Sequence, residues 1–323
     1  MDSTTDFLSI VPWVVNMSLK VLLDMDLSMD AEAGKTQVVL AVGGEAKRMG
    51  LDIPKALIPL NGSTLLDRCM DMFLGSGFRE FVFLLGYEDK KITEYLDRFD
   101  FRGAKITKSY DYAKGIAKGK AVKYALENGK IDANKRSVFA WPDDIFLQND
   151  LPKTVLAAHM EASRRFGTIA SEVVASAFRL PAGVVNVDER GVVTSFEEQP
   201  LIPIRASTGM RIFDPAAYSY FIDLIDLNKP GPIEFEKVVM PILAAKRKVY
   251  AIPIPPDSWL QINTQKELEQ AKKMIDFEPS LYAFGFDFLY FAASSGVWVH
   301  TILPSLIAIL PAPSRYSKIS EKV

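Results

Sequence analysis

Short apolar runs alternate with amphipathic stretches through the first half of this chain. Residues 37–42 (QVVLAV) form a continuous apolar run, which is typical of a parallel strand buried on both faces. Further strands are expected at 80–85 and 137–141, and helices at 63–73, 88–98 and 117–128. Repeated β-α-β units of this kind predict an α/β fold with a doubly wound, mostly parallel sheet and right-handed crossovers.

The pattern changes after about residue 166, where short strands follow one another with fewer helices between them. The segments that read as strands are 167–174, 182–187, 192–198 and 206–213, and helices are expected again at 233–246 and 264–275. Short consecutive strands favour antiparallel pairing, because antiparallel strands need only a tight turn between them. This part of the chain therefore predicts a mixed or antiparallel lobe added to the sheet.

Two regions lie outside the α/β pattern, which occupies residues 36–276. Residues 1–35 form an apolar and then acidic extension, whose apolar start is too short to span a bilayer. Residues 277–323 form an apolar C-terminal region, in which 288–310 carry no Asp, Glu, Lys or Arg over a length that could span a bilayer. A membrane contact through 288–310 and a buried or dimerising helical hairpin are both open readings, and a homo-oligomer is an open alternative.

Composition excludes several classes of function. The formal net charge of -2 gives no basic excess, so no nucleic-acid partner is expected. The only cysteine, Cys69, lies at helical spacing among apolar residues and is expected in the core. A chain that cannot form an internal disulfide fits a reducing compartment, and we expect a cytoplasmic protein. With two histidines in 323 residues, catalysis is expected to use carboxylates, lysines, arginines and a hard metal.

The segment VGGEAKRMGLDIPKALIPL carries the most specific chemistry. The first strand runs through Val42 directly into Gly43 and Gly44, where the absence of Cβ atoms lets backbone N–H groups approach a phosphate. Arg48 and Lys55 bring two cations to the same end of the sheet. Ligands of open α/β sheets bind at the carboxyl ends of the strands, so this loop predicts a phosphate-binding site.

The ordered set Gly-Gly, Arg-Met-Gly and Pro-Lys resembles the signature of the sugar-phosphate nucleotidyltransferases, and the resemblance covers about residues 37–276. It implies a Rossmann-like nucleotidyltransferase domain with a sugar-binding lobe. It also implies an Mg²⁺-dependent enzyme that forms an NDP-sugar and pyrophosphate from a nucleoside triphosphate and a sugar 1-phosphate. We expect an in-line attack on the α-phosphate by a phosphate that is already an anion, so that no general base would be required.

The resemblance assigns roles to individual residues of the nucleotide half. Arg48, Lys55 and Asp143 are the expected catalytic residues, and Asp143 stands where the family carries its Mg²⁺ ligand. The nucleotide is expected to contact Val42, Gly43 and Gly44, together with Gly115 and Ala117 from a second glycine-containing segment that opens a helix.

The sugar half departs from the family pattern at three positions. The sugar phosphate is expected to contact Gly183, Glu198, Gln199, Ser207 and Thr208. Gln199 stands where the family has a lysine, Ser207 replaces an asparagine, and Gln261 replaces the aspartate that is the second metal ligand. Asp144 and Asp257 are nearby carboxylates that could take over from Gln261.

These departures leave two alternatives open. The segments around Arg48, Lys55 and 60–62 also resemble the molybdenum-cofactor guanylyltransferases, which transfer a nucleotide to another acceptor. A non-catalytic homologue that binds a nucleotide or NDP-sugar is the second alternative. It predicts ligand binding without pyrophosphate release.

Overall fold

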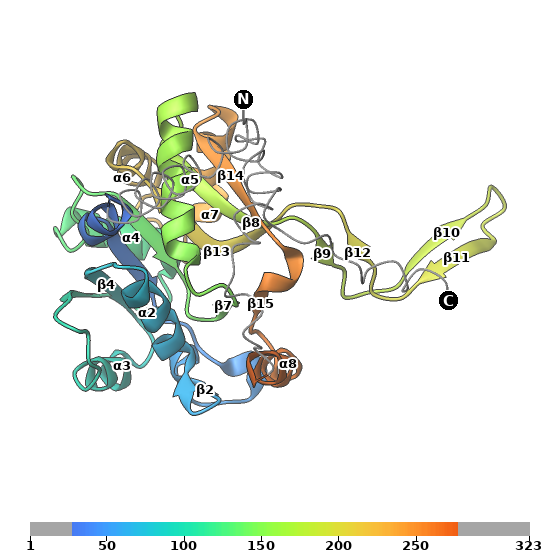
Figure 1. Cartoon of the computed structure of the whole chain (residues 1–323), viewed down its shortest axis with the longest axis horizontal. Coiled ribbons are helices and arrows are strands. Elements are labelled where there is room, and N and C mark those ends of the chain that lie inside the picture. The colour runs from blue at the N-terminus through green and yellow to red at the C-terminus, as the bar shows by residue number, and fades with distance from the viewer. Residues whose placement is uncertain (1–27, 277–323) are drawn as a thin grey trace, which may run out of the picture. The chain divides into compact units, whose positions relative to one another are not determined.

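The computed structural model describes residues 28–276, which fold around a seven-stranded sheet (Figure 1). The strand order is β14-β8-β13-β6-β1-β4-β5. In chain order these strands are β1 (Gln37–Ala41), β4 (Glu80–Leu85), β5 (Lys105–Tyr110), β6 (Ser137–Ala140), β8 (Ala170–Ala175), β13 (Ala206–Phe213) and β14 (Val249–Ile254). Only β13 runs antiparallel to its neighbours in this sheet. The α/β sheet is therefore mostly parallel, as the sequence predicts.

Strand β1 lies in the middle of the parallel half of the sheet, and this position explains why its sequence is continuously apolar. In β1, Val38, Val39 and Leu40 have no exposed surface. Val39 pairs with Val82 of β4 on one side and with Phe139 of β6 on the other. A central strand that is covered on both faces has no position for a polar side chain.

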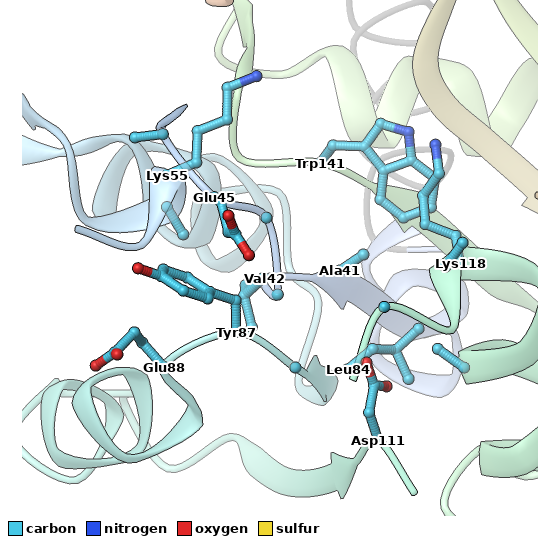
Figure 2. Close-up of a pocket in the computed structure, with 18 of the residues that line it drawn as sticks. Ala41, Val42, Glu45, Lys55, Leu84, Tyr87, Glu88, Asp111, Lys118 and Trp141 are labelled. Carbon is cyan, nitrogen blue, oxygen red and sulfur yellow. The ribbon is translucent and has the colours of Figure 1, made fainter. Parts of the chain in front are cut away.

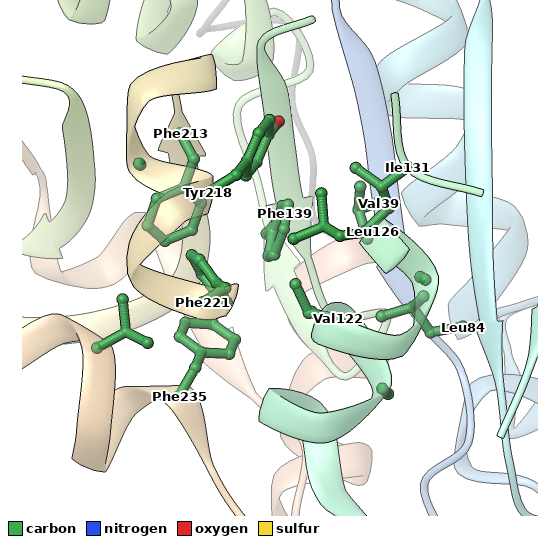
Figure 3. Close-up of a cluster of buried hydrophobic side chains, with 14 of the residues drawn as sticks. Val39, Leu84, Val122, Leu126, Ile131, Phe139, Phe213, Tyr218, Phe221 and Phe235 are labelled. Atoms are coloured by element: carbon green, nitrogen blue, oxygen red, sulfur yellow. The ribbon is translucent and has the colours of Figure 1, made fainter. Parts of the chain in front are cut away.

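Helices cover both faces of the sheet. On one face, α4 (Ala117–Glu127), α6 (Tyr218–Leu224) and α7 (Phe235–Ala245) enclose an aromatic core (Figure 3). Its rings meet edge to face: the centroids of Phe139 and Phe213 are 5.0 Å apart, and those of Phe213 and Phe221 are 5.2 Å apart. The other face carries α2 (Leu65–Gly75) and α5 (Leu151–Phe166), which pack on each other, with α5 also against β8 and β14. Cys69 of α2 is buried there, as expected.

The added lobe is a thin antiparallel arm between β8 and β13. It consists of β9 (Phe178–Arg179) paired with β12 (Leu201–Ile202), and of the hairpin β10 (Val184–Val187) with β11 (Val193–Glu197). Figure 1 shows this arm extending away from the sheet. Two of the four strands expected in the lobe, 167–174 and 206–213, belong instead to the central sheet as β8 and β13. The lobe is therefore smaller than the sequence pattern indicates.

The remaining elements lie outside the seven-stranded sheet. They are η1 (Lys47–Met49), η2 (Lys55–Leu57), β2 (Pro59–Leu60), β3 (Ser63–Thr64), α3 (Asp89–Leu96), β7 (Asp144–Phe146), η3 (Pro215–Ala217), η4 (Pro256–Ser258), β15 (Trp259–Gln261) and α8 (Gln265–Asp276). Helix α2 begins at Leu65, two residues later than the start expected from sequence. The Thr64 hydroxyl accepts from the Asp67 N–H and the Asp67 carboxylate accepts from the Thr64 N–H, a capping box that satisfies two backbone donors.

The end of the N-terminal extension belongs to the folded body. Residues 28–35 are helical, Ala33 is fully buried, and Asp30 lies 2.7 Å from the Lys153 ammonium of α5. Within residues 28–276 no helix has the length and apolarity needed to cross a bilayer. The open readings for residues 277–323, including a membrane contact through 288–310, fall outside the described residues, as do residues 1–27.

Candidate nucleotide-binding cleft

A cleft of about 1090 Å³ opens at the carboxyl ends of β1, β4, β5 and β6 (Figure 2). All eight residues expected for the nucleotide half line it, namely Val42, Gly43, Gly44, Arg48, Lys55, Gly115, Ala117 and Asp143. They come from segments up to about one hundred residues apart in the chain. The parallel sheet brings these segments together because its strand ends share one edge.

The glycine at position 43 is required by packing as well as by access. A Cβ added to Gly43 would lie 2.8 Å from the Gly86 nitrogen, which is closer than real Cβ atoms approach. The Tyr87 N–H also donates to the Gly43 carbonyl at 3.4 Å. The ends of β1 and β4 therefore meet backbone to backbone and leave a floor without side chains, which suits a flat or anionic ligand.

Lys55 connects three parts of the site. Its backbone N–H donates to the Gly44 carbonyl at 2.9 Å, which ties the Pro-Lys segment to the glycine loop. Its ammonium forms an ion pair with Asp143 and donates to the Asn263 side-chain oxygen at 2.9 Å. The Asp143 carbonyl in turn accepts from the Ile262 N–H at 2.8 Å, which holds the strand end beside the segment that contains Asn263.

Arg48 supplies an exposed cation at the mouth of the cleft. It lies in η1, where its neighbour Lys47 forms an ion pair with Glu45. Arg48 has no ion pair with any residue of the described range 28–276. A lining guanidinium without a carboxylate partner is suited to bidentate contact with phosphate.

The second glycine-containing segment forms another wall of the cleft. Gly115 and Ala117 both adopt left-handed backbone conformations, with φ values of 69° and 63°. A positive φ at a non-glycine residue is uncommon and is held in place by surrounding structure. The Lys118 ammonium that follows lies 4.7 Å from the Trp141 ring centroid and 2.5 Å from the Glu236 carboxylate. Figure 2 shows Lys118 beside Trp141, so this lysine has partners before any ligand binds.

Asp144, unlike Asp143, points into the protein. Its side chain is buried and one oxygen accepts from the Trp259 indole at 2.7 Å. A Cβ on Gly209 would lie 1.8 Å from the other oxygen, so the carboxyl fills the space that this glycine leaves. Burial, with the Asp143 charge second, raises the pKa of Asp144 to about 7. Gln261 faces Asp144 across the β15–β7 ladder, is exposed and does not line the cleft. Neither residue is positioned as a ligand for a metal in the cleft.

The residues expected for the sugar half do not line this cleft. Gly183 and Glu198 lie on the arm, where a Cβ on Gly183 would meet the Phe196 ring at 2.7 Å and a Glu198 oxygen at 3.0 Å. Gln199 adopts a left-handed conformation with a φ of 49°, and its carbonyl accepts from Arg179 at 3.1 Å. These three residues therefore form the base of the hairpin and lie together.

Ser207 and Thr208 have partners inside the fold. The Ser207 hydroxyl donates to Glu172 at 2.6 Å and accepts from Arg211 at 2.9 Å. The Thr208 hydroxyl is buried and donates to the Val173 carbonyl at 2.9 Å. Burial raises the pKa of Glu172 to about 7 although the Arg211 guanidinium opposes the shift. This network fixes β13 against β8, and it occupies both hydroxyls.

The donor set of the cleft fits a magnesium ion carried by a substrate. No group of three or more His, Cys, Asp or Glu side chains among residues 28–276 could hold a metal on its own. Mg²⁺ usually takes one or two protein carboxylates and completes its shell with phosphate oxygens and water. Asp143 can provide that single carboxylate, because its side chain lines the cleft beside Lys55.

Asn263 and Asp111 also line the cleft and were not predicted as site residues. Asn263 contacts Lys55, and its signal was present, because it precedes a capping box in which Thr264 and Glu267 begin α8. Asp111 follows β5 and lines the far part of the cleft. A lone aspartate after a strand belongs to no recognisable motif, and only the fold shows that it faces a ligand site.

Comparison with known proteins agrees with this geometry. A profile of the family described as Nucleotidyl transferase matches residues 37–276. The mannose-1-phosphate guanylyltransferase catalytic subunit beta of Dictyostelium discoideum is 23% identical over 237 residues, which are 72% of this chain and 62% of that protein. The UTP–glucose-1-phosphate uridylyltransferase AglF of Haloferax volcanii is 25% identical over 252 residues, which are 75% of this chain and 96% of that protein.

The fold also matches solved structures. A proposed glucose-1-phosphate thymidylyltransferase of Bacillus anthracis superimposes with a TM-score of 0.56 at 17% identity, over 78% of this chain and 98% of that one. At this identity the likeness concerns the fold alone.

Proposed function

Because this chain belongs to the nucleotidyl transferase family, we propose that it joins a sugar 1-phosphate to a nucleoside triphosphate and releases pyrophosphate. The observation that carries the proposal is the convergence of Arg48, Lys55 and Asp143 on one cleft with a floor of glycines. Relatives named for this reaction with different bases and sugars support the reaction type.

Three residues of the cleft have assigned tasks in the proposed reaction. The sugar phosphate oxygen attacks the α-phosphorus in line, and the bond from that phosphorus to the pyrophosphate oxygen breaks. Arg48 holds the departing β- and γ-phosphates at the mouth of the cleft. Lys55 leaves Asp143 for the reacting phosphate, where it neutralises charge that develops in the transition state. Asp143 would hold Mg²⁺, which supplies charge neutralisation and orients phosphate oxygens when it is bound.

No general base is needed, and none of the residues within 28–276 that line the cleft is a histidine. The attacking phosphate is already ionised at neutral pH, so positioning and charge neutralisation supply the rate enhancement. His159 is buried between Ser171 and Asp214 in the core, away from the lining residues.

The test is pyrophosphate release from a panel of nucleoside triphosphates, each offered with sugar 1-phosphates and with the molybdenum cofactor as acceptors, with Mg²⁺ present and absent. We expect release with one pair of substrates and only with the metal. Arg48→Ala and Asp143→Asn should each lower kcat by about 10²–10³. Arg98→Ala is the matched control, because Arg98 is exposed and outside the cleft.

The panel also separates the alternatives. Nucleotide binding without pyrophosphate release on any acceptor would favour a non-catalytic homologue, an alternative raised by the departures from the family pattern at Gln199, Ser207 and Gln261. Release only with a molybdenum-cofactor acceptor would favour the second enzyme class. Near-normal activity of Arg48→Ala or Asp143→Asn would contradict the assigned roles.

A further inference from the structure

Asp111 is an unpaired carboxylate at the end of the cleft remote from Asp143. It directly follows β5, and its N–H donates to the Leu85 carbonyl at 2.8 Å, which continues the sheet by one residue. A Cβ on Gly86 would lie 2.6 Å from the Asp111 carboxylate, so the carboxylate rests against the bare end of β4. Figure 2 shows Asp111 below Leu84 and Lys55 at the opposite side of the pocket. No described side chain forms a hydrogen bond or ion pair with this carboxylate.

The strand order separates Asp111 from the part of the cleft that holds Asp143. Asp143 follows β6 and Asp111 follows β5, and the order β6-β1-β4-β5 puts three strand spacings between them. At about 4.8 Å per spacing, the two strand ends lie about 14 Å apart. If the α-phosphate lies at Lys55 and Asp143, the ribose hydroxyls remain near it. The Watson–Crick edge of the base is the part of the nucleotide that extends farthest from the phosphates.

Asp111 carries an energetic cost that a ligand can offset. Burial raises the pKa of this carboxyl to about 7. A partly buried carboxylate without a donor loses hydration and gains nothing in return. A ligand that supplies N–H donors would replace the interactions that this carboxylate loses.

We propose that Asp111 accepts hydrogen bonds from N1–H and the N2 amino group of guanine, so that the nucleotide substrate is GTP. The inference rests on the proposed function for the placement of the phosphates. Guanine alone presents two adjacent donors on its Watson–Crick edge, which match the two oxygens of an ionised carboxylate. Uracil and thymine place one N–H between two carbonyls, and adenine and cytosine place an amino group beside an acceptor nitrogen.

The experiment compares equilibrium binding of GTP, ATP, CTP, UTP and dTTP to the full chain by titration calorimetry. Asp111→Asn changes two acceptors into one acceptor and one donor with little change of shape. Asp223→Asn is the matched control, because Asp223 is exposed on α6 and outside the cleft. We expect the wild type to bind GTP most tightly. Asp111→Asn should lower the GTP-to-UTP preference by about 10- to 100-fold, since one bidentate contact is lost and uracil gains a matching pair.

Three results would overturn the inference. These are a wild type that prefers another base, an Asp111→Asn variant that keeps the full preference for GTP, and equal weakening of every ribonucleotide. The last result, with 2′-deoxy-GTP insensitive to the change, would assign Asp111 to the ribose.

Binding and catalysis are read separately, so the two proposals can fail independently. Selective GTP binding without pyrophosphate release would overturn the proposed reaction and support Asp111 as the guanine contact. Pyrophosphate release with a preferred base other than guanine would support the proposed reaction and overturn Asp111 as the guanine contact.

Discussion

Lys55 is the residue on which the charge balance of the cleft depends. Its ammonium forms an ion pair with the Asp143 carboxylate. We expect Lys55→Met to lower kcat by about 10²–10³, because the variant keeps the length of the side chain and loses its charge at the reacting phosphate. Steady-state kinetics with saturating nucleotide measure the effect. The assignment is wrong if kcat stays within a few-fold of the wild type.

Asp111 should make the stability of the protein depend on pH in an unusual direction. Its pKa is about 7 in the folded protein, well above the ordinary value of 3.8. The folded state therefore holds the proton more tightly than the unfolded state, and stability is lost as pH rises through this range. We expect Asp111→Asn to raise Tm relative to the wild type above about pH 7, with the difference vanishing near pH 4.

Thermal melts of both proteins from pH 4 to 8.5 provide the measurement. Other ionisable groups that line the cleft, among them Lys90, Lys114 and Lys118, are present in both proteins, so their titration cancels in the comparison. An Asp111→Asn variant that is less stable at pH 8 would show that the carboxylate has a structural partner. Combined with weaker GTP binding, a more stable variant would identify a residue kept for function at the expense of stability.

Individual site residues could be predicted from sequence where chemistry leaves a local pattern. Arg48 and Lys55 follow a glycine pair after a buried strand, and that order is specific enough to place them in one cleft. Asp111 and Asn263 could not be found in this way, because their roles depend on which strand ends become neighbours. Asp144 shows the converse problem. It adjoins Asp143 in sequence, but the sequence does not show that its carboxyl is buried against Gly209.

At the scale of elements, the contact between the ends of β1 and β4 shapes the cleft floor. A Cβ at Gly43 would meet the Gly86 backbone at 2.8 Å, whereas the nearest atom to a Cβ at Gly44 is the Lys55 Cβ at 3.8 Å. We expect Gly43→Ala to reduce the free energy of unfolding by about 1–3 kcal/mol, because backbone must move to relieve the overlap. Gly44→Ala, the matched control, should cost less than about 1 kcal/mol.

Denaturant unfolding of the two variants tests this directly. Nucleotide affinity should fall with Gly43→Ala even where the protein remains folded, since separating the strand ends opens the floor. Equal stability of the two variants would show that the β1 and β4 ends can part without cost.

Elements with a strong repeating pattern could be predicted from sequence. The elements that were not predicted lack such a pattern for physical reasons, with α5 as an exception. β4 and β13 have the bounds expected from sequence. β5 is an edge strand with Lys105 and Tyr110 exposed, so it has no continuous apolar run. β9 and β12 have two residues each, which is too short for any period. α5 repeats apolar residues at helical spacing and could have been recognised.

At the largest scale that the structure describes, residues 28–276 divide into a packed body and an exposed arm. The body holds every residue assigned to the nucleotide, and the arm holds Gly183, Glu198 and Gln199. Sequence could place both sets in one family site, but it could not show the distance between them. That distance depends on how the arm leaves β8 and returns to β13, which no local pattern encodes.

Within residues 28–276, the arm should also be the region that unfolds locally at the lowest free-energy cost. In the hairpin, Val185 pairs with Phe196 and Val187 with Val193, and these four side chains are between 46% and 66% exposed. A two-stranded hairpin without a packed face is marginally stable, so it opens at low free-energy cost. We expect trypsin to cut at Arg190, in the hairpin turn, before any other site within residues 28–276. Mass spectrometry of brief native digests identifies the first fragments, and Arg190→Gln is the control.

The same digestion tests whether the arm takes part in the reaction. If Glu198 and its neighbours contact the sugar phosphate, the arm must approach the body once both substrates are bound, and contacts formed there would lower the rate of opening. Nucleotide and sugar 1-phosphate together should then slow cleavage at Arg190, whereas nucleotide alone should not. Unchanged cleavage with both substrates present would place the sugar phosphate on the body and remove the arm residues from the site.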